Sequence, residues 1–471
     1  MSRALAALIF CGCATSAGTP AVPVPASASA PQVPAATAAP PPASAASPGG
    51  GDALFADKEV GWDASDSANL PDIQAFARDY QGFSGSAKTA RRAVAGLLAL
   101  TGGKATELAA GKRPDRTPGA RYVLTGVGGS AAAFVLLGKQ PVEHGVRIII
   151  AAVDAPHIEL KQRPIYSKAG FAMLDTMLYG DLDLASWLSH PLALYLHVAR
   201  SGAASGGLDI ILGEDADQPV LVIPDLLPHL SRKAQHDQVV DSPERMDAIA
   251  ARSEQALAEY LAAQGVDPSV LAEAEAALVP AGPAVLIGVD RALIAGYGHQ
   301  QRALAYAAVR ALLAAGTPEH TAVVIVVSTT GDRGIGIDFV RMALSRILAT
   351  LSTRGEALDS LDTRQFYARS AGLAGAALAG AQSHGVVLAP DSDDSPPETL
   401  RRVLDIFERA GAQYQISGKP GWGPSRGLSE LELGMVDIAL PVTGIGTPFE
   451  LLSTLDLYQA LLACKGWLTQ S

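Results

Sequence analysis

The 471-residue sequence predicts a layered α/β fold that carries an inserted, β-rich second domain. Short runs of β-branched residues alternate with helical patterns both before Pro156 and after Gly282, as in layered α/β domains. Residues 156–240, in contrast, contain short strand-like runs without helical periodicity. We therefore assign residues 52–155 and 283–471 to an α/β domain and residues 156–282 to the insertion.

In the α/β part, periodicity and composition predict the following elements. The strands are Arg121–Thr125, Ala132–Leu137, Gly145–Val153, Ala322–Val327 and Met435–Leu440, of which AVVIVV (322–327) is typical of a fully buried strand. The helices are Ser86–Leu100, one that a capping box at Ser395–Glu398 opens and Gly411 ends, and Pro448–Cys464.

In the insertion, the predicted strands are Leu194–Val198, Leu208–Leu212 and Val220–Ile223. A helix is predicted from Ser242 to about Ala263, and a second near Ser269–Leu278.

Composition excludes several classes of protein. Lys and Arg number 36 against 47 Asp and Glu, a formal net charge of −11, which argues against a general nucleic-acid binder. Three cysteines are too few for a disulfide framework or a Cys-rich zinc module. The sequence contains no run of 18 apolar residues, so a bundle of membrane-spanning helices is not expected.

The first residues resemble a bacterial lipoprotein signal. Arg3 precedes a short apolar run, and the small Gly12 precedes Cys13, so residues 1–13 are predicted to be a signal with lipidation at Cys13. Residues 14–50 contain 13 Ala, 9 Pro and no charged residue, a composition typical of a semi-stiff tether, which we extend to residue 51. The expected location is the periplasmic side of a bacterial envelope, with membrane contact only through the lipid; the alternative is a cytoplasmic protein.

Four segments resemble the aspartyl aminopeptidase and aminopeptidase I family of zinc metallopeptidases. The segment 148–164 is similar to the family's "GAHTDSP-L-LKP", and 170–198, 220–232 and 423–441 follow further family motifs in the same order. The resemblance implies an α/β catalytic domain with an inserted β-rich domain. It also implies homo-oligomers and release of N-terminal, often acidic, residues from peptides with two zinc ions.

The resemblance also places the family's functional positions on this sequence. The first metal histidine corresponds to Ala152, although the following aspartate is kept as Asp154. The remaining positions carry residues that do not ligate zinc: Gln300 and Gln301, Thr330 and Gly331, Ala376, and Gly446 for the last metal histidine. Since a zinc pair needs imidazoles and carboxylates, no cofactor is expected, whereas the family binds zinc.

Two functional hypotheses follow. In the first, the chain is a catalytically inactive family member that acts as an exported, lipid-anchored binding or scaffold protein, with peptides as possible partners and Asp154 as a relic. In the alternative, it is an active zinc aminopeptidase with a relocated site, for instance Asp154, His157 and Glu159. Strand alternation puts His157 and Glu159 on one face and Asp154 on the other, unless the chain turns at Pro156. For His157 we favour a structural role. We interpret His299, Gln300 and Gln301 as polar side chains that occupy the place of the family's metal ions.

The lipoprotein assignment makes a direct prediction about the mature chain. We expect the mature protein to begin at Cys13 and to carry the mass of a lipid there, because the cleavage site requires the small Gly12 before the cysteine. Mass spectrometry of the N-terminal peptide measures this, and an unprocessed Met1 terminus would contradict it.

Overall fold

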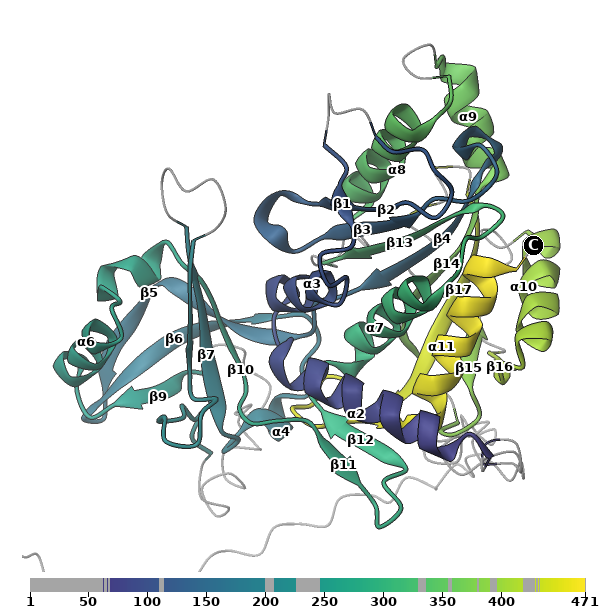
Figure 1. Ribbon diagram of the computed structural model, residues 1–471. Helices are drawn as coiled ribbons and strands as arrows, with labels where there is room; N and C mark the ends of the chain where they lie inside the picture. The colour runs from purple at the N-terminus through teal and green to yellow at the C-terminus, as the bar shows by residue number, and fades with distance from the viewer. Residues whose placement is uncertain are drawn as a thin grey trace, which may run out of the picture. The chain divides into compact units, whose positions relative to one another are not determined.

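The computed structural model describes most of the compact unit formed by residues 50–471 (Figure 1). The predicted signal, Cys13 and the tether lie outside the described residues. The described residues are 62, 66, 68–109, 114–199, 207–225, 246–328, 336–354, 358–378, 381–389, 396–417, 428, 431 and 433–470.

A 12-stranded mixed sheet forms the centre of the α/β part, in the order β1-β2-β3-β13-β4-β14-β17-β18-β12-β11, with β15 pairing β16 and β17. Its strands are β1 (Thr106–Glu107), β2 (Arg121–Thr125), β3 (Ala132–Leu136), β4 (Val146–Ala152), β11 (Val285–Ile287), β12 (Leu293–Gly296), β13 (Thr321–Val327), β14 (Ala371–Leu378), β15 (Val386–Ala389), β16 (Tyr414–Ile416), β17 (Gly434–Thr443) and β18 (Glu450–Ser453).

The middle of this sheet is parallel: β13, β4, β14 and β17 run in the same direction. Strands β4 and β13 are buried along their whole length, as their β-branched sequences predict. Alternate residues of β4 enter two different cores, with Ile149 and Ala151 on one face and Ile148 and Ile150 on the other. The carboxyl ends of β4 and β13 lie side by side, since Val153 donates a backbone hydrogen bond to Val327.

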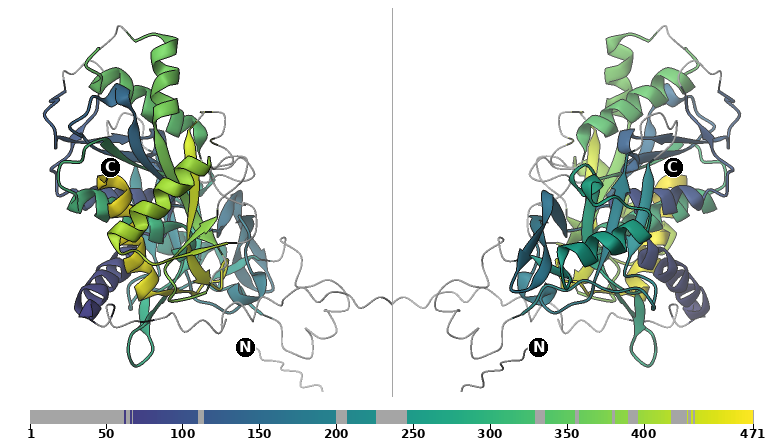
Figure 2. Two further views of the ribbon diagram at one scale, coloured as in Figure 1. Left: turned by 90° about the vertical axis from the view of Figure 1, so that its right-hand side faces the viewer. Right: turned by 90° about the vertical axis from the view of Figure 1, so that its left-hand side faces the viewer.

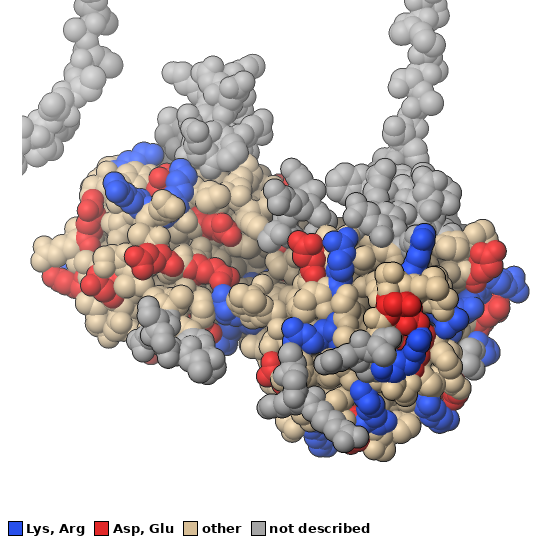
Figure 3. All heavy atoms as spheres, turned by 90° about the horizontal axis from the view of Figure 1, so that it is seen from above, with Lys and Arg blue, Asp and Glu red and all other residues tan. Residues whose placement is uncertain are grey.

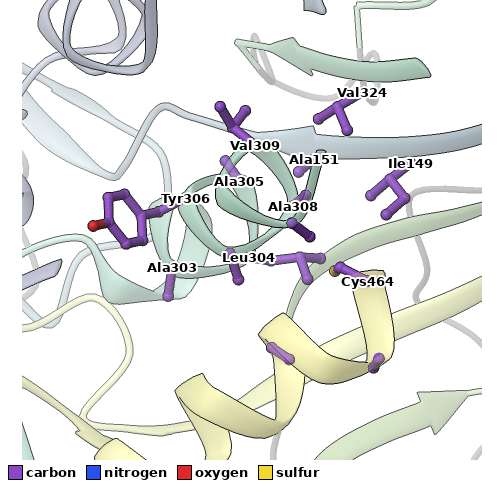
Figure 4. Close-up of a cluster of buried hydrophobic side chains, with 14 of the residues drawn as sticks. Ile149, Ala151, Ala303, Leu304, Ala305, Tyr306, Ala308, Val309, Val324 and Cys464 are labelled. Carbon is purple, nitrogen blue, oxygen red and sulfur yellow. The ribbon is translucent and has the colours of Figure 1, made fainter. Parts of the chain in front are cut away.

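Helices cover both faces of the sheet (Figures 1 and 2). Helices α2 (Leu70–Ser86), α3 (Ala90–Ala99), α7 (His299–Ala314), α10 (Pro397–Ala410) and α11 (Thr454–Thr469) enclose one core, and α8 (Ile337–Leu351) and α9 (Ser360–Arg369) the other. Figure 4 shows small side chains of α7, among them Ala303, Ala305 and Ala308, between β4 and α11. Gly375 of β14 also leaves room for α7, because a Cβ at this position would lie only 1.9 Å from Cδ2 of Leu304 on that helix. These small residues allow α7 to lie close to the sheet.

A second, six-stranded antiparallel sheet has the order β8-β7-β10-β5-β6-β9. Its core contains Trp187 of the short helix α4 (Leu184–Trp187), and α6 (Glu254–Ala263) packs against β6 and β9. Its strands are β5 (His157–Lys168), β6 (Phe171–Tyr179), β7 (Leu192–Val198), β8 (Leu208–Leu212), β9 (Ala248–Ala251) and β10 (Glu275–Pro280).

Several predicted elements of the α/β part are wrong in detail. The single helix Ser86–Leu100 is the end of one helix and all of another, because Thr89 caps the second helix by accepting from the backbone N–H of Arg92. Helix α10 begins at Pro397, with Pro396 as an N-cap that makes no side-chain hydrogen bond, and Ser395 of the predicted capping box lies outside the described residues. The closing helix begins at Thr454, because the residues before it pair with β12 and β17 as β18.

The insertion differs more from its prediction. The segment expected to open a helix at Ser242 instead contains β9, which pairs with β6, and α6 begins only at Glu254. The helix expected near Ser269–Leu278 is a 3-10 turn, η4 (Pro268–Ala272), followed by β10, which pairs with strands on both sides. In both places backbone pairing overrides the helical propensity of alanine and leucine. Residues 220–223 form only isolated bridges to Leu192 and Ile249.

None of the helices in the described part of the chain has the length and apolar character needed to cross a bilayer.

Lys88 connects the two sheets from the loop between α2 and α3. Only 3% of its side chain is exposed, and Nζ donates to both carboxylate oxygens of Glu214, at 2.7 and 2.9 Å. It donates as well to the carbonyl oxygens of Pro280 and Gly282, both at 2.7 Å. Burial lowers the pKa of Lys88, whereas Glu214 opposes that shift. Removing this ammonium leaves the Glu214 carboxylate without its cation and the two carbonyls without this donor, whereas Tyr195 Oη and the backbone N–H of Gly282 still donate to Glu214.

Lys88→Ala is therefore expected to lower the free energy of unfolding by about 3 kcal/mol, the lower end of the range for a broken buried ion pair, because Glu214 is partly exposed and keeps two other donors. Chemical denaturation followed by tryptophan fluorescence measures the loss. The matched control is Lys161→Ala, which breaks the more exposed pair with Asp175 in the second sheet and should cost less than about 1 kcal/mol. Equal losses in the two variants would show that Lys88 does not join the sheets.

Candidate functional site

A cavity of about 250 Å³ lies where the carboxyl ends of β4 and β13 meet the second sheet. Asp154 and Ser328 line it from the α/β part, and residues at the ends of β5 and β6 line it from the second sheet. Arg91 and Arg92 in the first turn of α3 add positive charge, whereas Glu275 of β10 adds negative charge. The cavity therefore presents both signs of charge to a ligand.

Asp154 is the central acid of this cavity. It lies two residues beyond β4, is 3% exposed, and accepts hydrogen bonds from Tyr179 Oη at 2.8 Å and Ser328 Oγ at 3.0 Å. Burial, and then the charge of Asp154, raises the pKa of Tyr179, so this phenol remains a protonated donor at neutral pH. Tyr179 was absent from the sequence-based predictions, because only the pairing of β5 with β6 brings it to Asp154.

The structure brings Asp154, His157 and Glu159 to the same cavity. The predicted shared face of His157 and Glu159 is confirmed by a 3.3 Å distance between Nε2 and Oε1. Asp154 precedes β5 and is connected to His157 through Tyr179. The Tyr179 hydroxyl donates to Asp154, and its ring stacks on His157 with the ring centres 4.5 Å apart. His157 Nδ1 also lies 2.8 Å from the carbonyl oxygen of Ala155. Both ring nitrogens of His157 therefore have partners in the protein.

Arg302 of α7 holds the floor of the cavity in place. Its side chain is 1% exposed and donates to three backbone carbonyls: Val153 at 3.0 Å, Tyr297 at 3.4 Å and Lys88 at 2.9 Å. The guanidinium also lies 5.0 Å from the centre of the Tyr297 ring. Arg302 thereby connects the carboxyl end of β4 with the start of α7 and with the loop that carries Lys88.

The polar side chains predicted at the start of α7 have some buried atoms without a hydrogen-bond partner among the described residues. His299 is fully buried and bonds to Tyr80 Oη through Nδ1 at 2.8 Å. Its Nε2, like Oε1 of Gln300 and of Gln301, is buried without a hydrogen-bond partner among the described residues. Burial, with a contribution from Arg302, lowers the pKa of His299 to about 3, so the ring is neutral at physiological pH.

Glu450 caps the start of α7. Its buried carboxylate accepts from the backbone N–H of Gln300 at 2.8 Å and of Gly446 at 3.4 Å. Burial raises the pKa of Glu450 to about 7, although these backbone donors and Arg302 oppose the rise. Glu450 was not among the predicted site residues, because nothing near it in the sequence marks it as the cap of a helix that begins 151 residues earlier.

Gly446 adopts a backbone conformation reserved for glycine, with φ at +81°. A Cβ at this position would lie 2.6 Å from the carbonyl oxygen of Asp181. The Gly446 carbonyl accepts from Trp187 Nε1 at 2.9 Å and from the backbone N–H of Asp183 at 3.1 Å. The loop is thus packed directly against the second sheet, without space for a histidine side chain.

The described residues do not fit a zinc pair of the family type. Ala152 is fully buried and offers a methyl group, and Gln300 and Gln301 offer amides. Ala376 lies on β14 opposite Ala439, whereas Thr330 and Gly331 are outside the described residues. Within the described ranges, three or more His, Cys, Asp or Glu side chains nowhere gather as a metal centre would require. We therefore route no catalytic step through zinc.

The fold is a layered α/β domain that carries a second, antiparallel sheet between β4 and β11, and comparisons with known proteins identify its family. The family model described as aminopeptidase I zinc metalloprotease (M18) matches residues 86–366, more than half of the chain. The chain therefore belongs to the M18 aminopeptidase family, as the sequence motifs predict.

Relatives extend this match over almost the whole globular part. A probable M18 family aminopeptidase 1 from Borrelia garinii is 24% identical over 462 residues, covering 87% of this chain and 99% of the relative. The crystal structure of an M18 family aminopeptidase from Thermotoga maritima matches with a TM-score of 0.78 at 23% identity, covering 88% and 100%. The mApe1 dodecamer of S. cerevisiae matches with a TM-score of 0.65 at 16% identity, covering 83% and 95%.

These relatives contradict the prediction of a catalytically inactive, lipid-anchored binding or scaffold protein. They are named aminopeptidases and align over most of this chain. The alternative, an active aminopeptidase, fits them better. The wrong prediction gave a few replaced positions more weight than the similarity of the whole globular part.

His299 and Glu450 are expected to act in opposite directions on stability. The pKa of His299 falls from 6.5 to about 3 on folding, so the unfolded chain takes up the extra proton and stability falls as the pH is lowered through that window. The pKa of Glu450 rises from 4.5 to about 7, so stability falls as the pH is raised through that window. Where the two windows overlap, from pH 4.5 to 6.5, the two effects offset each other.

Glu450→Gln should expose the effect of His299. From pH 6.5 to 4.5, the free energy of unfolding of this variant should fall by roughly 2 kcal/mol relative to the unmodified protein. Urea denaturation at three pH values measures this. In His299→Asn the opposite trend is expected, with stability falling as the pH rises from 4.5 to 7. Identical pH profiles for all three proteins would contradict both assignments.

Proposed function

We propose that this protein is an aminopeptidase that releases N-terminal residues from peptides, with the Asp154 cavity as its substrate site. The observation that carries the proposal is the M18 family match over residues 86–366, together with relatives named aminopeptidases that cover more than four fifths of the chain. The cavity lies at the carboxyl ends of parallel strands, where layered α/β proteins commonly bind ligands.

The charges around the cavity suit a peptide with a free amino terminus. Asp154 and Glu159 are carboxylates that can pair with an α-ammonium group. Arg92 lines the cavity from the first turn of α3, next to Arg91, whose Nη2 donates to Glu275 at 2.6 Å. A carboxylate on the first side chain of the substrate can pair with Arg92, so we propose peptides with N-terminal Asp or Glu as preferred substrates.

Proton transfer can be assigned to groups already in the cavity. Glu159 is partly exposed and pairs with His157, so it can accept a proton from an attacking water. Tyr179 retains its proton and can donate a hydrogen bond, although Asp154 accepts it in the free protein. In family members that bind zinc, the metal would polarise the scissile carbonyl. The loss of zinc ligands in this chain remains a prediction, which elemental analysis of the purified protein tests.

Two broader proposals accompany this function. Because a relative is solved as a dodecamer, we propose that this chain also forms homo-oligomers. Export and anchoring through Cys13 remain predictions from the sequence.

The test is release of the first residue from chromogenic substrates that begin with Glu, Asp, Ala or Leu, using the full-length protein with measured zinc content. We expect activity toward Glu and Asp substrates. Asp154→Asn should reduce kcat/KM at least about 100-fold, and Arg92→Ala about 10-fold for acidic substrates only, as a lost charged contact implies.

Lys161→Ala is the control variant, because its ion pair with Asp175 lies outside the cavity lining. It should retain full activity on every substrate. No release from any of the four substrates, with and without added zinc, would overturn the proposed function. An Arg92→Ala variant that loses Leu and Glu substrates equally would overturn the acidic preference.

A further inference from the structure

A second charged site lies at the opposite edge of the sheet, where the parallel strands begin. Arg147 is the second residue of β4, and only 7% of its surface is exposed. In the register of the sheet it lies beside Ala322 of β13 and Ala371 of β14. These two small neighbours leave space for the guanidinium over the ring of Trp467, whose centre is 5.0 Å away.

The charge of Arg147 is not compensated by a carboxylate in the described residues. Its Nε is buried and has no hydrogen-bond partner there. The ring of Trp467 offers a cation–π contact, which is weaker than pairing with an anion. Burial of a charged guanidinium without an acceptor is unfavourable, so the site is incomplete in this respect.

The charged neighbours of Arg147 are themselves positive or can become positive. The charge of Arg402 on α10, after burial, lowers the pKa of Arg147 to about 10. Burial and the charges of Arg147, Arg402 and His144 lower the pKa of His320, and only Glu319 opposes them. The Glu319 carboxylate, however, accepts from Gln140 Nε2 at 2.8 Å and lies 3.6 Å from Lys139 Nζ.

We propose that the amino ends of these parallel strands bind a phosphate-class oxyanion at the Arg147 guanidinium, with Arg402, His320 and His144 adding to the positive surroundings. A guanidinium presents parallel N–H donors that match two oxygens of such an anion. The dianionic charge of phosphate matches the two arginines. This anion site is separate from the Asp154 cavity, which lies at the carboxyl ends of the same strands.

Binding is tested by thermal unfolding and calorimetry of the full-length protein with inorganic phosphate, against sodium chloride at equal ionic strength. We expect a saturable rise in Tm of about 1–3 °C and a Kd on the order of 1 mM. A phosphate monoester such as methyl phosphate is tested in parallel, because comparable binding extends the site to phosphorylated small molecules. No saturable response to either anion would overturn the proposal.

Two substitutions locate the site. Arg147→Met should raise Tm in phosphate-free buffer, because it removes a buried unpaired charge, and should abolish the phosphate response. Arg402→Gln, at an exposed position of α10, should leave Tm unchanged and weaken phosphate binding at least about fivefold.

The matched control is Arg401→Gln on the same helix, whose arginine pairs with Asp405 at 3.0 Å. It removes the same charge and should leave phosphate affinity unchanged. Equal weakening by Arg401→Gln and Arg402→Gln would indicate non-specific attraction and overturn the site. A lower Tm for Arg147→Met with the phosphate response intact would do the same.

Discussion

The hydrogen bonds from Arg302 to three backbone carbonyls are the constraint on which the rest of the site depends. They join the end of β4, the residues before α7 and the loop of Lys88. Lys88 in turn reaches the second sheet through Glu214 and two carbonyls. The buried guanidinium thus connects three segments that lie next to the cavity.

Several ionisable groups are buried near the cavity, and burial is the largest cause of the shift in the pKa of each. Tyr179 remains a donor to Asp154, and His299 remains neutral beside Tyr80. Glu450 accepts a hydrogen bond from the backbone N–H at the start of α7, and the charge of Arg302 opposes the rise of its pKa. These buried polar groups thus form a network of hydrogen bonds next to the cavity, within an otherwise apolar interior. On the surface viewed in Figure 3, Lys and Arg lie among Asp and Glu.

The parts of the fold that local sequence determines were predictable. Strands β4 and β13 follow from their apolar β-branched runs, and the order of motifs indicates the family. The parts that depend on pairing between distant segments were not: β9 and β10 have helix-favouring alanines, and only neighbouring strands make them extended. Asp154 was found because it follows a recognisable strand, whereas Tyr179 and Glu450 reach the site from far along the chain. Activity was misjudged because single positions were read without the whole-chain similarity.

The packing of Gly446 also limits how this loop can change over evolutionary time. A histidine there would require a new backbone conformation and a displacement of the Asp181 carbonyl. That carbonyl belongs to the turn that carries α4, whose Trp187 is itself bonded to Gly446. Placing a histidine at this position is therefore not a single mutational step. Substitutions in the turn before α4 must come first, so the neighbouring segment constrains the order of changes.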